Sequence, residues 1–287
     1  MLASLTLNPF NWFKQDGLLV HLHADSIKII DVLTGFEVNP IGNAVLEPML
    51  LKSILSDGFN WQNAVEALTA KLALINPEPK TPLRIVLSND FVRYLLLPAQ
   101  KVTLSHTEKN AYAKAAFRQL HGVTADSWQI KHDNPAPNQA TMLAAIDQRL
   151  QQSLEQVAVN YRLKLVSLTP YLMQVFNGLH KQLKDFSGYL ALIEGERIVL
   201  LNINNGQIEQ LKSQFIGSDW QIELNQFLDR EQTLGHASSN NVLLCVLNHY
   251  AKTLFVKKGW HINHVKQNNH GFAFSPNLHI SPKEISA

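Results

Sequence analysis

The sequence predicts an α/β protein built from two similar lobes. Predicted strands and helices alternate along the chain, and a group of short strands opens each half, the second about 170 residues after the first. A chain of 287 residues, 46% of them hydrophobic, is long enough to bury a large core. The expected segments are a lead-in at 1–16, a first lobe with an inserted small subdomain at 17–168, a second lobe at 169–262 and a polar C-terminal tail at 263–287.

The first half is expected to alternate between short strands and helices. Ser105 opens one of these helices, and Glu108 three residues later completes a capping box. The apolar runs at 83–87 and 91–97 are separated by a short polar link, which predicts a hairpin or paired strands. In chain order the expected elements are strands at 18–23 and 26–33, a helix at 59–75, strands at 83–87 and 91–97, a helix at 105–122, strands at 128–131 and 141–147, a helix at 148–161 and a strand at 163–168.

The second half is expected to open with a helix and then a three-strand meander. Thr169 and Pro170 supply an N-cap and a proline at the first helical position. Asn204, Asn205 and Gly206 form a strong hairpin turn inside the meander. In chain order the expected elements are a helix at 171–183, strands at 188–194, 197–203 and 207–214, a helix at 220–234 and strands at 241–247 and 254–256.

Composition argues against two classes of protein. The 25 basic and 23 acidic residues leave a net charge of +2, too small for the basic surface that nucleic-acid binding requires. No apolar stretch reaches the roughly 18 residues of a membrane-spanning helix, because charged residues interrupt 190–203. Cys245 is the only cysteine, so no internal disulfide forms, and its apolar neighbours predict a buried thiol in a reducing compartment.

The first 15 residues, MLASLTLNPFNWFKQ, carry three aromatic side chains. They lack the charged start, apolar stretch and cleavage site of a signal peptide. Phe10, Trp12 and Phe13 suit either a lead-in packed on the first lobe or a short anchor on a membrane surface or partner. We favour the packed lead-in.

Three segments carry a family resemblance. GLLVHLHADSIKIIDV, at 17–32, resembles the first phosphate segment of PilM-like proteins and keeps Ser26, Ile27 and Lys28 of that pattern. LRIVLSNDFVRYLLLPAQKVTLSHTEKNAYAKAAFRQ, at 83–119, resembles the strand pair of PilM-like and GspL-like proteins that ends in Leu-Pro and leads to a Glu-bearing helix. FSGYLALIEGERIVLLNINNGQI, at 186–208, resembles the second phosphate segment. From about Gly17 to Val256 the resemblance implies a duplicated actin-like (ribonuclease H-like) ATPase fold with two lobes.

Both phosphate segments depart from the family pattern. His21 and His23 stand where the pattern has Asp and Gly, and Ile193, Glu194 and Gly195 stand where it has Asp-x-Gly. The acidic residue organises a metal ion or its water, and the glycines let backbone N–H groups approach the phosphates. The stretch 241–250 also holds no glycine for an adenosine-binding turn. We therefore expect a pseudo-ATPase with no catalytic residue, no metal and no bound cofactor.

The resemblance implies a function in assembly of a type IV pilus or a type II secretion system. Its members act at the cytoplasmic face of the inner membrane and bind the short tail of a bitopic membrane protein, which they link to the assembly ATPase. We therefore expect a non-catalytic cytoplasmic scaffold that reaches the membrane only through its partners. No residue of the binding groove can be carried over from the family.

Three alternatives stay open. An active nucleotide-binding ATPase or sugar-kinase-like enzyme of the same fold would use Lys28, Asp25 or Asp31 for phosphate or metal. A homodimer with no ligand in the cleft is a second alternative. A metal site is the third, since His21 and His23 share one face of a strand and the pair His261 and His264 lies near the C-terminus. With 12 histidines in the chain, such spacings also arise by chance.

Overall fold

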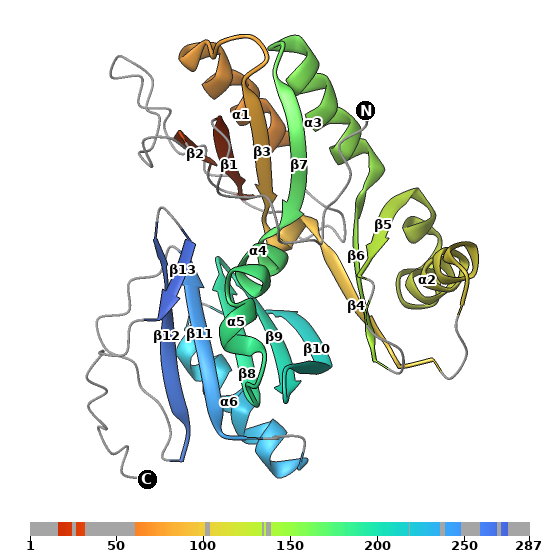
Figure 1. The fold of residues 1–287 in the computed structure, drawn as a ribbon, viewed down its shortest axis with the longest axis vertical. Helices are drawn as coiled ribbons and strands as arrows, with labels where there is room; N and C mark the ends of the chain where they lie inside the picture. Colours follow the sequence, from red (N-terminus) through yellow and green to blue (C-terminus); the bar gives the residue numbers. More distant parts are fainter. Residues whose placement is uncertain are drawn as a thin grey trace. The chain divides into compact units, whose positions relative to one another are not determined.

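The chain divides into two units, residues 1–174 and 175–287, and each has a sheet of its own (Figure 1). The sequence places this boundary at 168/169. The structure is a computed structural model, and it describes residues 17–24, 27–31, 61–100, 104–133, 135, 139–217, 219–235, 239–247, 259–268 and 271–274. Phe10, Trp12, Phe13 and the strand expected at 254–256 lie outside the described residues.

The larger sheet of unit 1 has the strand order β2-β1-β3-β7. β1 is antiparallel to β2 and parallel to β3, which is parallel to β7. Helices α1 and α3 contact each other, and the Tyr161 hydroxyl donates to the Thr69 carbonyl oxygen at 2.8 Å. These elements are β1 (Leu18–Leu22), β2 (Ile27–Asp31), α1 (Gln62–Ile75), β3 (Pro82–Leu87), α3 (Gln148–Asn160) and β7 (Lys164–Pro170).

Between β3 and α3 the chain forms a small antiparallel sheet with the order β4-β6-β5. Helix α2 packs on β5, where Phe117 meets Trp128 edge to face at 5.8 Å. The sequence places an inserted small subdomain somewhere within 17–168, and this stretch of chain lies inside those bounds. Its elements are η1 (Asn89–Phe91), β4 (Arg93–Leu97), α2 (His106–His121), η2 (Gly122–Ser127), β5 (Trp128–His132) and β6 (Thr141–Asp147).

The predicted pairing of the runs at 83–87 and 91–97 is wrong. β3 lies in the larger sheet between β1 and β7, and β4 pairs with β6 in the small sheet. The polar link is a short 3-10 helix, and the Ser88 hydroxyl accepts from the Asp90 N–H at 3.1 Å. Ser88, Asn89 and Asp90 therefore redirect the chain into a second sheet and do not close a hairpin.

The predicted start of α2 is confirmed. The Ser105 hydroxyl accepts from the Glu108 backbone N–H at 3.3 Å, and the Glu108 carboxylate accepts from the Ser105 N–H at 2.8 Å. Hydrogen bonds from the Ser105 side chain and backbone lower the pKa of Glu108. Such a box satisfies two N–H groups that the helix itself leaves without partners.

Unit 2 holds a six-stranded sheet with the order β10-β9-β8-β11-β12-β13. The helix expected at 171–183 is interrupted at Leu179, directly after Gly178, and Pro170 belongs to β7. β12 and β13 continue the sheet beyond residue 262, where the sequence places the end of the second lobe. The elements are α4 (Tyr171–Gly178), α5 (His180–Leu183), β8 (Gly188–Glu194), β9 (Arg197–Asn204), β10 (Gln207–Phe215), α6 (Trp220–Thr233), β11 (Asn241–Leu247), β12 (His261–Asn268) and β13 (Gly271–Phe274).

The two units share a strand pattern. In unit 1 the order β2-β1-β3-β7 combines one antiparallel pair with parallel neighbours, and β9-β8-β11-β12 repeats it in unit 2. The predicted meander β8–β10 is present, and Asn205 and Gly206 turn it with φ of 48° and 76°. Positive φ at both central residues is the geometry of a type I′ turn.

Gly17 and Gly188 mark the same point in the two units. Gly17 directly precedes β1 and Gly188 is the first residue of β8, with φ of 135° and 142°. A Cβ on Gly17 would stand 2.3 Å from the Pro82 carbonyl oxygen, and one on Gly188 would stand 2.3 Å from that of Asn241. Pro82 and Asn241 begin the neighbouring parallel strands β3 and β11. The same close contact is therefore built twice, although the two halves share no visible sequence repeat.

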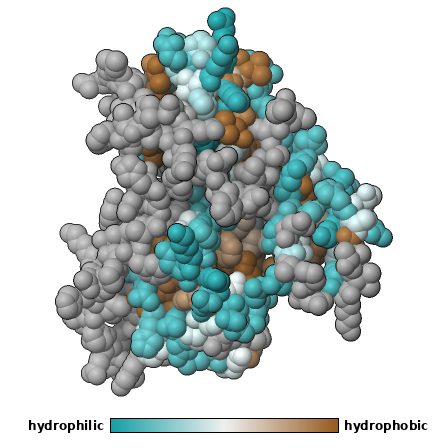
Figure 2. All heavy atoms as spheres, in the orientation of Figure 1, coloured by the Kyte–Doolittle hydropathy of each residue, from teal (hydrophilic) through white to brown (hydrophobic). Residues whose placement is uncertain are grey.

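Helix α6 covers an apolar face of the unit 2 sheet. Trp220, Leu224 and Phe227 are buried at helical spacing, and Phe227 contacts the Tyr189 ring edge to face at 6.3 Å. Leu234, the C-cap residue of α6, is 55% exposed. On the face shown in Figure 2, hydrophilic residues cover most of the coloured surface. In the part of the chain that the structure describes, no helix is long and apolar enough to cross a membrane.

Candidate functional site

The first phosphate segment lies at the end of β1, on a polar face of the unit 1 sheet. Side chains of directly paired strand residues share a face. His21 pairs with Lys28 on β2, and Arg84 on β3 pairs with Ser167 on β7. Because Leu19 pairs with Arg84 and lies two residues before His21, all four polar side chains stand on one face. That face is rich in cationic and hydroxyl groups.

His21 and His23 are both buried, with 3% and 7% of their surface exposed. Their rings stack with centres 6.3 Å apart and planes 12° apart, as the spacing of two along a strand predicts. Burial first, and then the charges of His23 and Lys28, lower the pKa of His21 from 6.5 to about 3. His21 is therefore a neutral imidazole at physiological pH and carries neither the charge nor the oxygen ligands of an aspartate.

The residues of the enzymatic alternative are only partly described. Lys28 is exposed on β2, across from His21. Asp25 lies outside the described residues, and of Asp31 the structure describes the strand backbone alone, paired with Leu18. The structure thus brings His21, His23 and Lys28 together in unit 1, whereas Glu194 and Gly195 belong to unit 2.

The second phosphate segment is the tight turn between β8 and β9. Glu194 and Arg197 are directly opposite residues on either side of the turn, and both are buried. The Arg197 guanidinium donates to the Ser213 hydroxyl at 3.1 Å and stacks over the Phe215 ring at 4.1 Å. Glu196 is exposed at the tip of the turn. This turn therefore presents two carboxylates, the buried Glu194 inside the stretch that the family pattern gives as Asp-x-Gly and the exposed Glu196 directly after it.

The backbone conformation of the turn, and not a lack of space for a side chain, favours glycine at position 195. Its φ is 54°, and a Cβ at this position would meet no other atom within 4 Å. Glycine at the first central position is typical of type II′ hairpin turns. The backbone beside Gly195 is consequently approachable, but the carboxylates of Glu194 and Glu196 would oppose a polyanion there.

Three further expectations from the sequence can be compared with the structure. His261 and His264 lie three apart on β12, so their side chains point to opposite faces and cannot share a metal ion. Among the described residues no three His, Cys, Asp or Glu side chains gather as metal ligands. Cys245 is buried in β11 at 2% exposure, as predicted. The stretch that lacks an adenosine turn is strand over 241–247, and the rest of it lies outside the described residues.

The sequence analysis did not predict the buried hydrogen-bonded cluster around Asn89, which lies beside the first phosphate segment. Asn89 is fully buried, and its Oδ1 accepts from the Tyr94 hydroxyl at 2.7 Å and from the Leu172 N–H at 3.2 Å. It thereby holds the first turn of α4 against the start of the small sheet. Next to it, the Ser88 N–H donates to the Leu22 carbonyl at 2.9 Å. The only sequence signal was a short polar interruption between two apolar runs.

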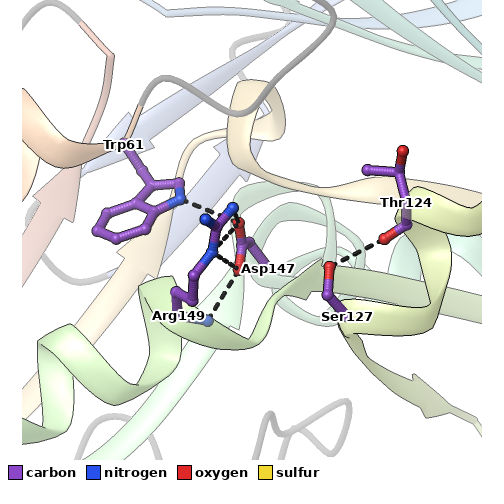
Figure 3. A network of polar contacts seen from close by, with 5 residues as sticks. All are labelled: Trp61, Thr124, Ser127, Asp147 and Arg149. Atoms are coloured by element: carbon purple, nitrogen blue, oxygen red, sulfur yellow. Dashed lines mark hydrogen bonds and ion pairs between the residues drawn. The ribbon is translucent and has the colours of Figure 1, made fainter.

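A second missed network joins α1, β6 and α3 (Figure 3). Asp147 accepts from the Trp61 indole N–H at 3.4 Å and from the Arg149 backbone N–H at 2.8 Å, and it pairs with the Arg149 guanidinium at 2.7 Å. Burial alone would raise the pKa of Asp147, but these hydrogen bonds outweigh it and lower the pKa. The network ties the start of α1 to the start of α3 at the end of β6.

No known protein family matches the sequence, and no curated protein matches it closely. Solved structures do match. A Bacteroides thetaiotaomicron protein with an actin-like ATPase fold and unknown function is 12% identical, with a TM-score of 0.53 over 84% of each chain. The PilM–PilN type IV pilus biogenesis complex gives 12% identity and a TM-score of 0.53 over 81% of this chain and 82% of that one. The cytoplasmic domain of EpsL, an inner-membrane component of the Vibrio cholerae type II secretion system, gives 8% identity and a TM-score of 0.49 over 87% and 89%.

These similarities show the fold. The first two structures match the chain over most of its length, so the protein has the actin-like ATPase fold that the sequence predicts. At 12% identity the similarity extends to the fold alone. The fold places both candidate segments at the ends of the first strands of its two sheets.

Proposed function

We propose that the protein is a non-catalytic scaffold in assembly of a type IV pilus or a related secretion system. In this role it binds the cytoplasmic tail of a bitopic inner-membrane protein and is held at the inner membrane by that partner. The single observation that carries the proposal is the buried, neutral His21 stacked on His23 at the end of β1.

The chemistry of this pair opposes catalysis with a magnesium nucleotide. Mg²⁺ prefers oxygen ligands in octahedral geometry, and a neutral imidazole does not replace a carboxylate there. The ring of His23 occupies a position where the family pattern has glycine, whose lack of a side chain lets backbone N–H groups reach a phosphate. In unit 2, Glu194 and Glu196 add negative charge at the second segment. Each of the two segments has thus lost a requirement of nucleotide binding.

The similarity in fold supports the proposed partner class. The PilM–PilN complex, which has a similar fold, is a type IV pilus biogenesis complex. A protein of this fold that no longer binds nucleotide retains a large surface on which a membrane protein's tail, and through it the assembly ATPase, can be organised. The first 16 residues, including Phe10, Trp12 and Phe13, are a second point of contact to test.

The first experiment is calorimetric titration of the purified protein with Mg-ATP and Mg-ADP, together with thermal unfolding. Bound nucleotide at 100 times its dissociation constant would stabilise the fold by about 2.7 kcal/mol, a shift that is easily detected. No heat and no shift are expected. Micromolar binding that Lys28→Ala abolishes would overturn the pseudo-ATPase and favour the ATPase or sugar-kinase-like alternative.

The second experiment tests the partner. Synthetic peptides of the cytoplasmic tails of bitopic pilus and secretion proteins are titrated by fluorescence anisotropy, with scrambled peptides as controls. Saturable binding of one tail and none of its scrambled form supports the scaffold. If no tail binds and mass measurement shows a concentration-dependent dimer, the homodimer alternative replaces it.

A further inference from the structure

Two histidines that the proposed function does not use meet at the surface of the small sheet. His106 is the first residue of α2, and His132 is the last residue of β5. Their ring centres are 5.4 Å apart and the ring planes are tilted by 59°. The contact between Phe117 and Trp128 packs α2 on β5 and so holds the two backbones in place. His106 is exposed and His132 is half-buried, so solvent reaches the pair.

The ring of His132 is oriented by the backbone. Its Nδ1 lies 2.9 Å from the Asp133 carbonyl oxygen. A carbonyl oxygen only accepts, so the proton of the neutral ring sits on Nδ1 and the lone pair is on Nε2. A histidine whose Nδ1–H is held by a carbonyl is the usual form of a metal-ligating histidine.

The ring of His106 has a comparable support. Its Nδ1 lies 2.8 Å from the side-chain amide of Asn110, one turn further along α2. The nitrogen and oxygen of an amide exchange places by a half-turn of the group. The structure sets the amide nitrogen of Asn110 toward Nδ1, so metal binding at Nε2 requires the half-turned amide, in which Nδ1–H donates to the Asn110 oxygen and Nε2 carries the lone pair. In that form both rings have a hydrogen-bond partner at Nδ1 and Nε2 left for a ligand.

The spacing of the rings fits one tetrahedral ion. With a metal–nitrogen distance of about 2.1 Å, each ring centre stands about 3.2 Å from the metal. Two such rings at a tetrahedral angle have centres about 5.2 Å apart, and at the right angle of a square-planar ion about 4.5 Å apart. The separation of 5.4 Å between His106 and His132 matches the tetrahedral case.

We propose that His106 and His132 form a surface site for a divalent transition metal that prefers tetrahedral nitrogen coordination, of which Zn²⁺ is the commonest in proteins. No group of three protein ligands gathers among the described residues, so water completes the coordination and the affinity is modest. The bound ion links the first turn of α2 to the end of β5 and braces the small sheet. This site is independent of the phosphate segments and of the proposed function.

The test is calorimetric titration of the chelator-treated full chain with ZnCl₂ at pH 7.5. Because the chain has 12 histidines, the informative quantity is the difference between variants. His106→Ala and His132→Ala should each remove the same single binding event. His180→Ala is the matched control, since His180 is an exposed histidine whose Nδ1 also contacts a carbonyl oxygen, that of Asn177 at 2.9 Å, and it should leave that event intact.

Asn110 gives a second test that keeps both ligands. Asn110→Ala should weaken zinc binding by about tenfold, whereas Asn110→Asp, which retains an acceptor for the His106 Nδ1–H, should not weaken it. Circular dichroism of the metal-free variants checks that each one is folded. Unchanged zinc binding by folded His106→Ala and His132→Ala would overturn the proposal.

Discussion

His23 and Glu194 occupy equivalent positions in the two units. Each lies six residues after the glycine that opens its sheet, from 17 to 23 and from 188 to 194, and each is buried at the end of the first strand. The two ends of the duplicated fold that would carry phosphate-binding residues therefore hold an imidazole in one unit and a carboxylate in the other. In unit 1 His23 stands at the glycine position of the family pattern, whereas in unit 2 the glycine of the pattern is Gly195, the residue after Glu194.

The equivalence of Gly17 and Gly188 can be tested by adding a methyl group. Gly188→Ala should destabilise the protein by about 3 kcal/mol or more, because the Cβ would stand 2.3 Å from the Asn241 carbonyl oxygen and the φ of 142° disfavours any side chain. Gly17→Ala should have a similar cost. Chemical denaturation with urea measures both free energies of unfolding.

Gly195→Ala is the matched control for these substitutions. It also has a positive φ, of 54°, but its Cβ would meet no atom within 4 Å. Its cost should stay near the 1 kcal/mol expected of a left-handed residue without a clash. Equal losses for Gly188→Ala and Gly195→Ala would show that conformation, and not the contact with Asn241, sets the cost.

Local signals in the sequence predicted the elements that depend on neighbouring residues. The capping box of Ser105 and Glu108 and the turn at Asn205 and Gly206 each satisfy hydrogen bonds or dihedral angles within a few residues. The pairing of β3 with β4 was wrong because a strand's partners are chosen by the whole sheet. β3 is long and apolar enough to lie between β1 and β7, and no local pattern distinguishes this from a hairpin.

The candidate site, too, has features that local sequence patterns predict and features that only the folded structure shows. A spacing of two along a strand predicted that His21 and His23 share a face, and their rings stack. The lowered pKa of His21 comes first from burial and then from the charges of His23 and Lys28, and the sequence does not reveal that burial. The contact of Trp61 with Asp147 joins residues 86 positions apart, so no pattern of short range could predict it.

The hydrogen bonds drawn in Figure 3 should contribute strongly to the stability of unit 1. Asp147→Ala removes the N-cap of α3 and leaves the Trp61 indole N–H without its acceptor, so the free energy of unfolding should fall by about 2 kcal/mol. Arg149→Ala should cost less than about 1 kcal/mol, because the Arg149 side chain is 70% exposed and surface ion pairs contribute little. A larger loss for Arg149→Ala than for Asp147→Ala would contradict this order. Thermal or urea unfolding at pH 7 measures both.

Acid should destabilise the protein through His21. Between pH 6.5 and about 3 the unfolded chain binds a proton at His21 that the folded chain does not, so stability falls as the pH is lowered through this window. One such group contributes up to about 1.4 kcal/mol per pH unit. His21→Leu removes this contribution, so between pH 6.5 and 4.5 the variant should lose about 2 kcal/mol less stability than the wild type. Parallel pH profiles for the two proteins would contradict a buried neutral His21.

The effect of Asp133 on the pH dependence of stability should be opposite to that of His21. Burial raises its pKa from 3.8 to about 6, although hydrogen bonds from the Met142 and Asp133 backbone N–H groups and the charge of Lys109 partly offset this. Between these two pH values the folded chain binds the extra proton, so stability falls as the pH rises through the window. Asp133→Asn keeps an oxygen for the Met142 N–H, 2.9 Å away, and should stabilise the protein at pH 7.5. The expected gain is about 1 kcal/mol, less than the full shift because solvent reaches part of the side chain.

Urea unfolding of Asp133→Asn at pH 4 and pH 7.5 tests this window. The gain should be present at pH 7.5 and smaller at pH 4, where Asp133 of the wild type is protonated in the folded chain. Asp126→Asn is the control: Asp126 is an exposed carboxylate 3.7 Å from Arg118, and its replacement should change the free energy of unfolding by less than about 0.5 kcal/mol at either pH.

Since His21 and Asp133 titrate with opposite signs, the double variant His21→Leu with Asp133→Asn should show a flatter pH profile than either single variant between pH 4 and 6. A gain from Asp133→Asn that is equal at both pH values would assign the stabilisation to the amide's hydrogen bonds instead of to the removed charge.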